Sequence, residues 1–153
     1  GLNISRNEAE EYIEKYFATY PGVRKFVDGL VSKAKKSGES HTLFGRIRPL
    51  PDITSSNHKT RSEQERIAMN SPIQGTAADI MKIAMLRVDR RLTESGMKSR
   101  LLLQIHDELL VETAADEVDE VKKILIEEMA GAAKLSVPLE VDAKQGENWL
   151  EAH

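Results

Sequence analysis

The stretch that most constrains the fold of this chain is "LLLQIHDELLVE", residues 101–112, in which a polar triplet interrupts leucine-rich sequence. Two short apolar runs that flank a polar cluster are typical of core strands joined by a tight turn. We therefore predict a β-hairpin from Leu101 to Thr113 that carries His106, Asp107 and Glu108 at its tip.

The tip of this hairpin has two possible interpretations. Oxygen ligands on a rigid turn suit Mg²⁺, which keeps several waters and takes only one or two protein carboxylates. Asp107 is the natural ligand, whereas Glu108 points elsewhere if the strand alternation persists. The alternative is an ordinary turn in which Asp107 bonds its own backbone.

Two helices are predicted in the first part of the chain. Ser5 and Glu8 form the capping-box pattern that starts a helix, and Pro21-Gly22 ends it. A second helix is expected from Val23 to Ser37. Four residues of the first helix recur at helical spacing and are expected in the core: Ile13, Tyr16, Phe17 and Tyr20.

Three further elements are predicted beyond residue 58. A long helix from Lys59 to Glu94 contains Pro72, which cannot bond the carbonyl of Ala68, so we expect a kink or two abutting helices. A helix follows from Asp116 to Ala133, and apolar alternation over residues 137–146 predicts a half-buried strand. The apolar stripe of the later helix consists of Val118, Val121, Leu125 and Met129. Helices packed on one side of a small antiparallel sheet give an α+β fold class.

Composition limits the class of protein. Of the 153 residues, 40% are hydrophobic and 31% are charged, which excludes a disordered chain. The absence of cysteine excludes disulfides and thiolate metal sites, and no apolar run approaches the roughly 20 residues that span a membrane.

The net charge of −3 conceals an asymmetry: residues 24–66 have a balance of +5 and residues 107–153 a balance of −9. This separation suggests a basic surface for phosphate, although scatter over solvated faces is also compatible with it.

Arginines mark the segment "HTLFGRIRPLPD", which is predicted as a short hairpin or irregular loop that pivots at Gly45. In an extended segment Arg46 and Arg48 share one face. The two prolines that follow confine the segment to a sheet edge or a loop. Two arginines on an exposed face are suited to phosphate, and they are also common on surfaces that bind nothing.

Polar residues at a spacing of four mark one face of the long helix: Arg66, Asn70 and Gln74. All three side chains carry hydrogen-bond donors. Every base pair of DNA presents an acceptor in the minor groove, at purine N3 or pyrimidine O2. Such a row of donors could therefore test base-pair geometry without reading sequence, or it could be the exposed face of an ordinary helix.

Taken together, two stretches carry a resemblance to a known family. "NSPIQGTAADIMKIAM" followed by "LLLQIHDELLVE" resembles the C-terminal part of the family A DNA polymerases, of the bacterial DNA polymerase I type. The resemblance continues in order through "EAEEYIEKYFATYPGV", "TLFGRIRPLP" and "GENWLEAH", so it covers essentially the whole chain. It implies that residues 1–58 are the end of the fingers subdomain and residues 59–153 the C-terminal part of the palm.

The resemblance also implies roles for the hairpin tip. Asp107 matches the metal-binding aspartate of the third palm motif, and Glu108 matches the acidic residue that follows it. His106 matches the histidine near the primer 3′ end. The implied cofactor is Mg²⁺ in a two-metal site, for which Asp107 is the one protein ligand that this chain provides.

DNA contacts are implied for the basic and polar positions. Residues 66, 70 and 74 match positions that contact the template and the minor groove at the primer terminus. Arg46 and Arg48 fall in a segment often written with three successive arginines, and Ile47 in the middle puts one backbone contact in doubt.

The implied activity is template-directed DNA synthesis in DNA replication and repair, in the bacterial cytoplasm at the nucleoid. Its partners are primer–template DNA, deoxynucleoside triphosphates and the N-terminal part of the polymerase, with no role for a membrane. No "DYSQIE"-like and no "RRxxKxxNFGxxYG"-like segment occurs in the chain. Since those segments hold the second palm aspartate and the triphosphate, we expect the isolated chain to be inert in synthesis.

Two alternative functions belong to other classes of protein. The chain could be a non-catalytic module that binds duplex DNA through its basic segment. It could also be a His-Asp metal-dependent phosphohydrolase, a chemistry that needs further His and Asp ligands on helices. The remaining histidines lie in loop-like or terminal segments, which disfavours the phosphohydrolase: His41, His58 and His153.

Overall fold

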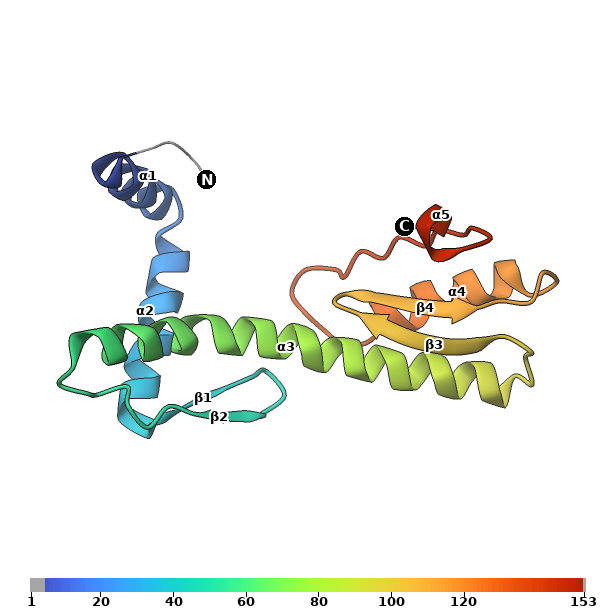
Figure 1. Cartoon of the computed structure of the whole chain (residues 1–153), viewed down its shortest axis with the longest axis horizontal. Coiled ribbons are helices and arrows are strands. Elements are labelled where there is room, and N and C mark those ends of the chain that lie inside the picture. The colour runs from blue at the N-terminus through green and yellow to red at the C-terminus, as the bar shows by residue number, and fades with distance from the viewer. Residues whose placement is uncertain (1–4, 153) are drawn as a thin grey trace. The chain divides into compact units, whose positions relative to one another are not determined.

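The computed structural model of the chain describes residues 5–152 and contains two compact units, Gly1–Gln74 and Gly75–His153. Helices and two small antiparallel sheets make up both units, which confirms the α+β class (Figure 1). The long helix α3, His58–Glu94, contributes residues to each unit. The units divide within α3, between Gln74 and Gly75.

The first unit begins with helices α1, Arg6–Thr19, and α2, Pro21–Ser37. The capping box is confirmed: the backbone N–H of Ser5 donates to Glu8 Oε2 at 2.7 Å, and that of Glu8 donates to Ser5 Oγ at 3.3 Å. Helix α2 starts at Pro21, two residues earlier than predicted. Proline suits a first helical position because the N–H that it lacks would have no partner there.

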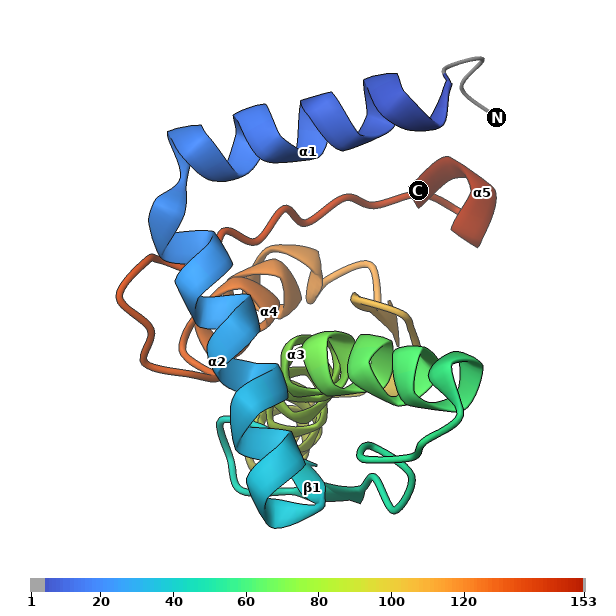
Figure 2. The ribbon, with the colours of Figure 1, turned by 90° about the vertical axis from the view of Figure 1, so that its left-hand side faces the viewer.

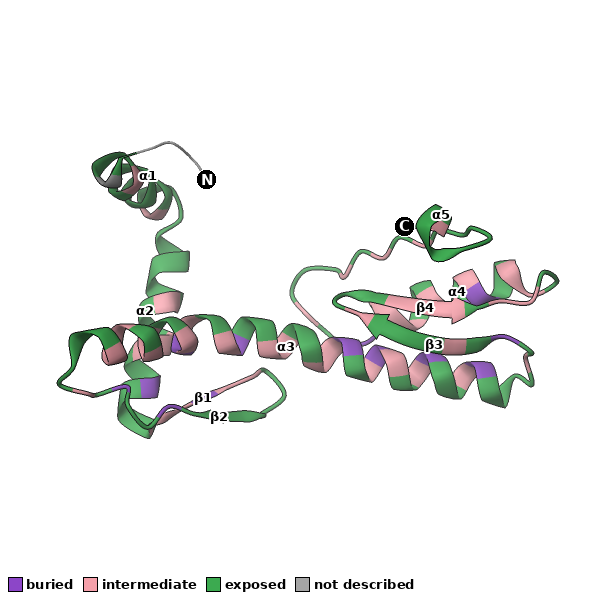
Figure 3. Ribbon diagram, viewed as in Figure 1, coloured by how far each residue is buried: buried purple, intermediate pink, exposed green. Residues whose placement is uncertain are grey.

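The expectation that the aromatic face of α1 is core is wrong for three of its four residues, and the fourth, Phe17, is half-buried. The side chains of Ile13 and Tyr16 are 51% exposed and Tyr20 is 54% exposed, and Figure 3 shows most of α1 as exposed. Figure 2 shows α1 leaving its junction with α2 at a wide angle, so the two helices meet near that junction. The Tyr16 ring contacts the ring of Tyr20, with centroids 5.1 Å apart, and that of Phe17, at 5.7 Å. Helical spacing thus identified a face of α1, but not whether another element covers it.

The core of the first unit joins α2, α3 and the segment after the first sheet. Its buried residues are Ala34, Leu50, Ile53 and Ala68, flanked by Val31 and Ile67. An ion pair of 2.6 Å between Lys35 and Glu65 also links α2 to α3. Because α3 is held in this way, its exposed face is fixed relative to the first sheet.

That sheet is the hairpin predicted around Gly45. Strand β1, Glu39–His41, pairs antiparallel with β2, Ile47–Pro49, so that Ser40 lies opposite Arg48. Gly45 has a φ of +83°, in the left-handed region that favours glycine, and it allows the chain to reverse. The hairpin presents Arg48 on a short strand of the first unit.

Helix α3 runs through Pro72 without a break. The side chain of Asn57 caps its start, where Oδ1 accepts from the backbone N–H of Lys59 at 3.0 Å. The alternative of two abutting helices is therefore wrong, whereas a bend within the helix stays a prediction. Proline removes only one hydrogen bond of the helical ladder, which a helix of 37 residues tolerates.

The second unit contains the hairpin predicted from residue 101. Strand β3, Arg100–Ile105, pairs antiparallel with β4, Glu108–Glu112, and the last pair joins Ile105 to Glu108. The turn therefore consists of His106 and Asp107 alone. Glu108 is the first residue of β4 and lies one position outside the predicted tip.

The core of the second unit lies between α3, the hairpin and helix α4, Val118–Ala130. Its buried residues are Val88, Leu92, Val121 and Ile124, with Leu109 and Val111 of β4 packed against them. Ile124 is fully buried although the predicted stripe of this helix did not include it. A short helix, α5, Trp149–Ala152, follows an extended segment.

A carboxylate ties the base of the hairpin to the start of α4. Glu117 accepts hydrogen bonds from the backbone N–H groups of Lys98 at 3.0 Å and Ser99 at 2.9 Å, and from Ser99 Oγ at 2.6 Å. Ser99 Oγ in turn accepts from the backbone N–H of Ala114 at 3.0 Å. The hydrogen bonds from Ser99 and Lys98 hold the pKa of the Glu117 carboxyl below its usual value.

The predicted strand over residues 137–146 is wrong, because that segment has no regular secondary structure. The alternation itself is real: Leu139, Val141 and Ala143 are half-buried while the residues between them are exposed. A strand needs a neighbour to accept and donate its backbone hydrogen bonds. Among the described residues no strand pairs with this segment.

Candidate functional site

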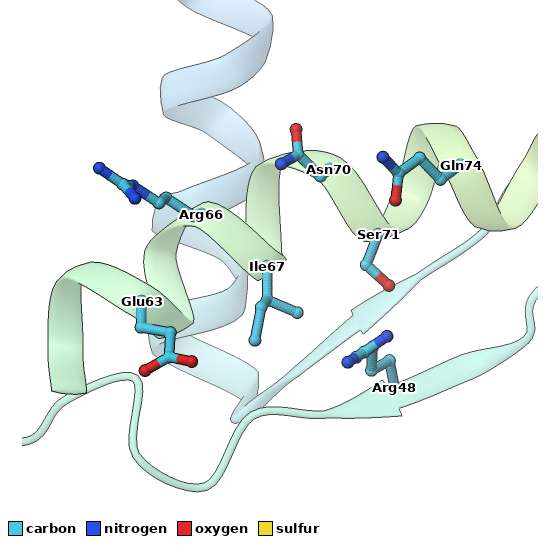
Figure 4. A pocket seen from close by; sticks show the side chains of 7 residues that line it. All are labelled: Arg48, Glu63, Arg66, Ile67, Asn70, Ser71 and Gln74. Carbon is cyan, nitrogen blue, oxygen red and sulfur yellow. The ribbon is translucent and has the colours of Figure 1, made fainter.

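A groove in the first unit gathers most of the polar residues singled out from the sequence. Figure 4 shows its lining side chains, six from α3 and one from β2: Glu63, Arg66, Ile67, Asn70, Ser71, Gln74 and Arg48. Its volume is about 240 Å³, below the roughly 300–1,000 Å³ of pockets that enclose a small molecule. The groove is therefore suited to contact along an extended ligand.

The predicted row on α3 is present in this groove. Arg66, Asn70 and Gln74 are exposed and follow one another along the helix in Figure 4. The spacing of four residues keeps them on neighbouring turns of a single face. A guanidinium and two amides thus present hydrogen-bond donors in a line.

The two arginines of the first hairpin differ in their positions. Arg48 lines the groove, and Figure 4 shows its guanidinium and the Ser71 hydroxyl pointing toward each other. Arg46 lies in the turn before β2, where its backbone N–H donates to Thr42 Oγ1 at 3.1 Å, and it is not among the lining residues. Only one of the pair therefore contributes to this groove.

Three lining residues were not singled out from the sequence: Glu63, Ile67 and Ser71. They repeat at a spacing of four, which places them on the flank of the predicted row. That spacing could have found them, but it could not have shown that β2 faces them. Two guanidinium groups and one carboxylate leave the lining with a positive balance that favours phosphate.

The acidic turn of the second unit is a separate feature. The φ of His106 is 50°, and His106 is the one residue other than glycine with a positive φ in the described part of the chain. Residues with a Cβ rarely adopt a positive φ, and the examples cluster at functional sites. The turn exposes both of its side chains, His106 and Asp107.

The carboxylate of Asp107 is exposed on this turn. Within residues 5–152 its exposed carboxylate has no hydrogen-bond or ion-pair partner, so both oxygens are available to a cation. In the same range no three His, Asp or Glu side chains come together in a group that could hold a metal. One carboxylate could supply one ligand of a Mg²⁺ site, and the described residues contain no group that would complete such a site.

The phosphohydrolase alternative gains no support from this turn. It requires several His and Asp ligands around one ion, and the described residues contain no such group. His41 is instead paired with Glu39 at 2.8 Å in the first unit, and His153 lies outside the described residues.

Comparison with known proteins identifies the class. The model of the family described as DNA polymerase family A matches residues 1–151, so the chain belongs to that family. Two relatives are the proteins named DNA polymerase I of Caldicellulosiruptor bescii, 51% identical over 150 residues, and of Geobacillus stearothermophilus, 50% identical over 151 residues. These matches cover 98% and 99% of this chain but only 18% and 17% of the two relatives.

A solved structure gives the same result for the fold. It is described as the POL domain of Pol1 from M. smegmatis in a complex with DNA primer-template and dNTP. It is 45% identical in sequence and has a TM-score of 0.94, and the match covers 99% of this chain and 27% of that one.

In the part of our chain that the structure describes, no helix combines the length and the apolar character needed to cross a membrane.

Proposed function

We propose that this chain is the C-terminal portion of a DNA-directed DNA polymerase that extends a primer on a DNA template. Residues 1–58 would belong to the fingers and residues 59–153 to the palm. Membership of DNA polymerase family A supports the proposal, as does the similarity to a structure described with primer-template and dNTP. The deoxynucleoside triphosphates and the N-terminal part of the polymerase are the further partners, and the bacterial cytoplasm with its nucleoid is the location.

The groove of the first unit would bind the primer–template duplex. Arg66, Asn70 and Gln74 line it with donors for the minor-groove acceptors that all base pairs share. Arg48 adds a positive charge for a backbone phosphate. Contacts of this kind would hold the duplex with little dependence on its sequence.

The turn of the second unit would supply the chemistry. The single observation that carries this assignment is the exposed, unpartnered carboxylate of Asp107 on a two-residue turn in a family A chain. Asp107 would hold Mg²⁺, which stabilises the charge on the attacking and leaving oxygens of nucleotidyl transfer. His106 would lie beside the primer terminus, and Glu108 would act in catalysis as the acidic residue that follows the metal-binding aspartate. Because one carboxylate cannot hold two ions, the isolated chain would be inactive.

The test is Asp107→Ala in the longer polymerase that carries this segment. We expect the primer-extension rate to fall on the order of a thousandfold, as when a group that stabilises transition-state charge is removed, while duplex affinity stays within about twofold. Asp142→Ala, which removes an exposed carboxylate elsewhere in the second unit, is the matched control and should extend normally. A parallel loss of duplex affinity in Asp107→Ala would mean that the residue is structural, contrary to the proposal.

A non-catalytic duplex-binding module is the second candidate, favoured by the positive lining of the groove. The isolated chain should then bind duplex DNA weakly, with an affinity that falls steeply as salt rises. Fluorescence titration at low and moderate salt measures this. A flat signal at both salt concentrations excludes the module.

A further inference from the structure

We propose that Gln104 is a positioning residue for Asp107 and that its side-chain amide fixes the peptide that joins His106 to Asp107. The inference rests on the proposed function, because positioning matters only if the carboxylate holds a cation. Its structural basis is one contact, in which Gln104 Nε2 donates to the backbone carbonyl of His106 at 2.6 Å.

The anchor of this contact is part of a paired strand. Gln104 lies in β3 opposite Leu109 of β4, and β4 is packed on the core of the second unit through Leu109 and Val111. The last backbone pair of the hairpin joins Ile105 to Glu108, so the carbonyl of His106 lies beyond the ladder. The amide of Gln104 therefore extends the constraint of the sheet by one peptide into the turn.

The conformation of the turn explains why such a constraint is needed. A two-residue hairpin turn favours a positive φ at its first residue, and the φ of 50° is costly for a residue with a Cβ, so a hydrogen bond to the His106 carbonyl helps to hold this conformation. Rotation of the peptide after His106 would carry the Asp107 Cα and its carboxylate with it. A metal-ligating group has to be held within about 0.5 Å of its productive position.

The side chain of Gln104 takes no part in the apolar packing of the fold. Its side chain is exposed and belongs to neither of the two apolar cores. Substitution should therefore act through the lost hydrogen bond rather than through packing. Methionine has almost the same length as glutamine and no donor, whereas glutamate keeps the shape but can only accept when it is ionised.

The first experiment uses the isolated chain and needs no activity. NMR spectra of the wild type, Gln104→Met, Gln104→Glu and the control Gln145→Met are compared at the His106 carbonyl carbon and the Asp107 amide. Both signals should shift in the two Gln104 variants, because the carbonyl loses its donor, and stay in place in Gln145→Met, whose glutamine is exposed in the extended segment. Unchanged signals in Gln104→Met overturn the proposal.

The second experiment uses the longer polymerase and measures the Mg²⁺ concentration that gives half of the maximal extension rate. Gln104→Met should raise this concentration about tenfold, as is usual when a group behind a metal ligand is removed, and leave duplex affinity unchanged. A merely structural role would lower the rate at every Mg²⁺ concentration and leave the half-maximal concentration unchanged, which would overturn the inference.

The two proposals fail in different ways. If Asp107→Ala extends primers as well as the wild type, the catalytic assignment of the turn is wrong. If Asp107→Ala is inactive while Gln104→Met keeps the wild-type Mg²⁺ requirement, only the positioning role is wrong.

Discussion

The groove of the first unit and the turn of the second differ in the number of side chains on which their candidate functions depend. The groove spreads its lining over seven side chains, most of them on successive turns of one helix. The turn consists of two residues, of which one carries a carboxylate. The paired strands of the hairpin and one side-chain hydrogen bond hold the turn in place. Binding of a long polymer tolerates the loss of one contact among many, whereas ligation of a cation depends on the position of a single group.

The two regions also depend on separate apolar cores. The core behind the groove contains Ala34, Leu50, Ile53 and Ala68, and that behind the turn contains Val88, Leu92, Val121 and Ile124. No residue belongs to both lists. A change in one core should therefore affect its own region first.

The largest expected effect tests this separation. Ile124→Ala removes a fully buried side chain of the second unit and should lower the free energy of unfolding by about 2–5 kcal/mol. Hydrogen exchange followed residue by residue should show faster exchange in the hairpin and α4, with protection around Ala68 retained. Ile126→Ala on the same helix is the control, because Ile126 is 43% exposed and should cost about 0.5 kcal/mol or less. Equal loss of protection in both cores would contradict their independence.

A smaller effect is expected from one change in the groove. Arg66→Glu should weaken duplex binding by the isolated chain roughly tenfold at low salt and reduce the slope of log affinity against log salt by about 1. The comparison variant is Arg90→Glu, which makes the same change on an exposed part of α3 outside the groove. If both variants bind alike, the groove is not the DNA-binding surface.

The smallest effect concerns the carboxylate at the base of the hairpin. The folded pKa of Glu117 lies below its ordinary value of 4.5, so its contribution to stability is complete above that value and is lost as the pH falls through the folded pKa. Glu117→Gln should therefore lower the urea midpoint at neutral pH and flatten its decline under acid conditions. Glu140→Gln, an exposed position in the segment without regular secondary structure, should leave both unchanged. A decline with pH as steep as in the wild type would show that other groups cause it.

The amino-acid sequence by itself determined the local elements. Capping at Ser5 and the turn at Gly45 follow from hydrogen-bonding groups and φ preferences that act over a few residues, and the hairpin around residues 106 and 107 follows from the apolar runs on either side of it. The spacing of residues 66, 70 and 74 likewise fixed a common face, because one helix carries all three. Sequence similarity along the whole chain then indicated the family, which no single helix or turn defines.

Only the tertiary structure decided what those elements meet. The aromatic face of α1 has core periodicity yet is about half exposed, and residues 137–146 alternate in burial but form no strand. In both cases the pattern describes one side of a contact, and the partner surface is set by residues elsewhere. The placement of Arg48 toward Ser71, and of the Gln104 amide on the turn carbonyl, depends in the same way on how strands and helices approach one another in space.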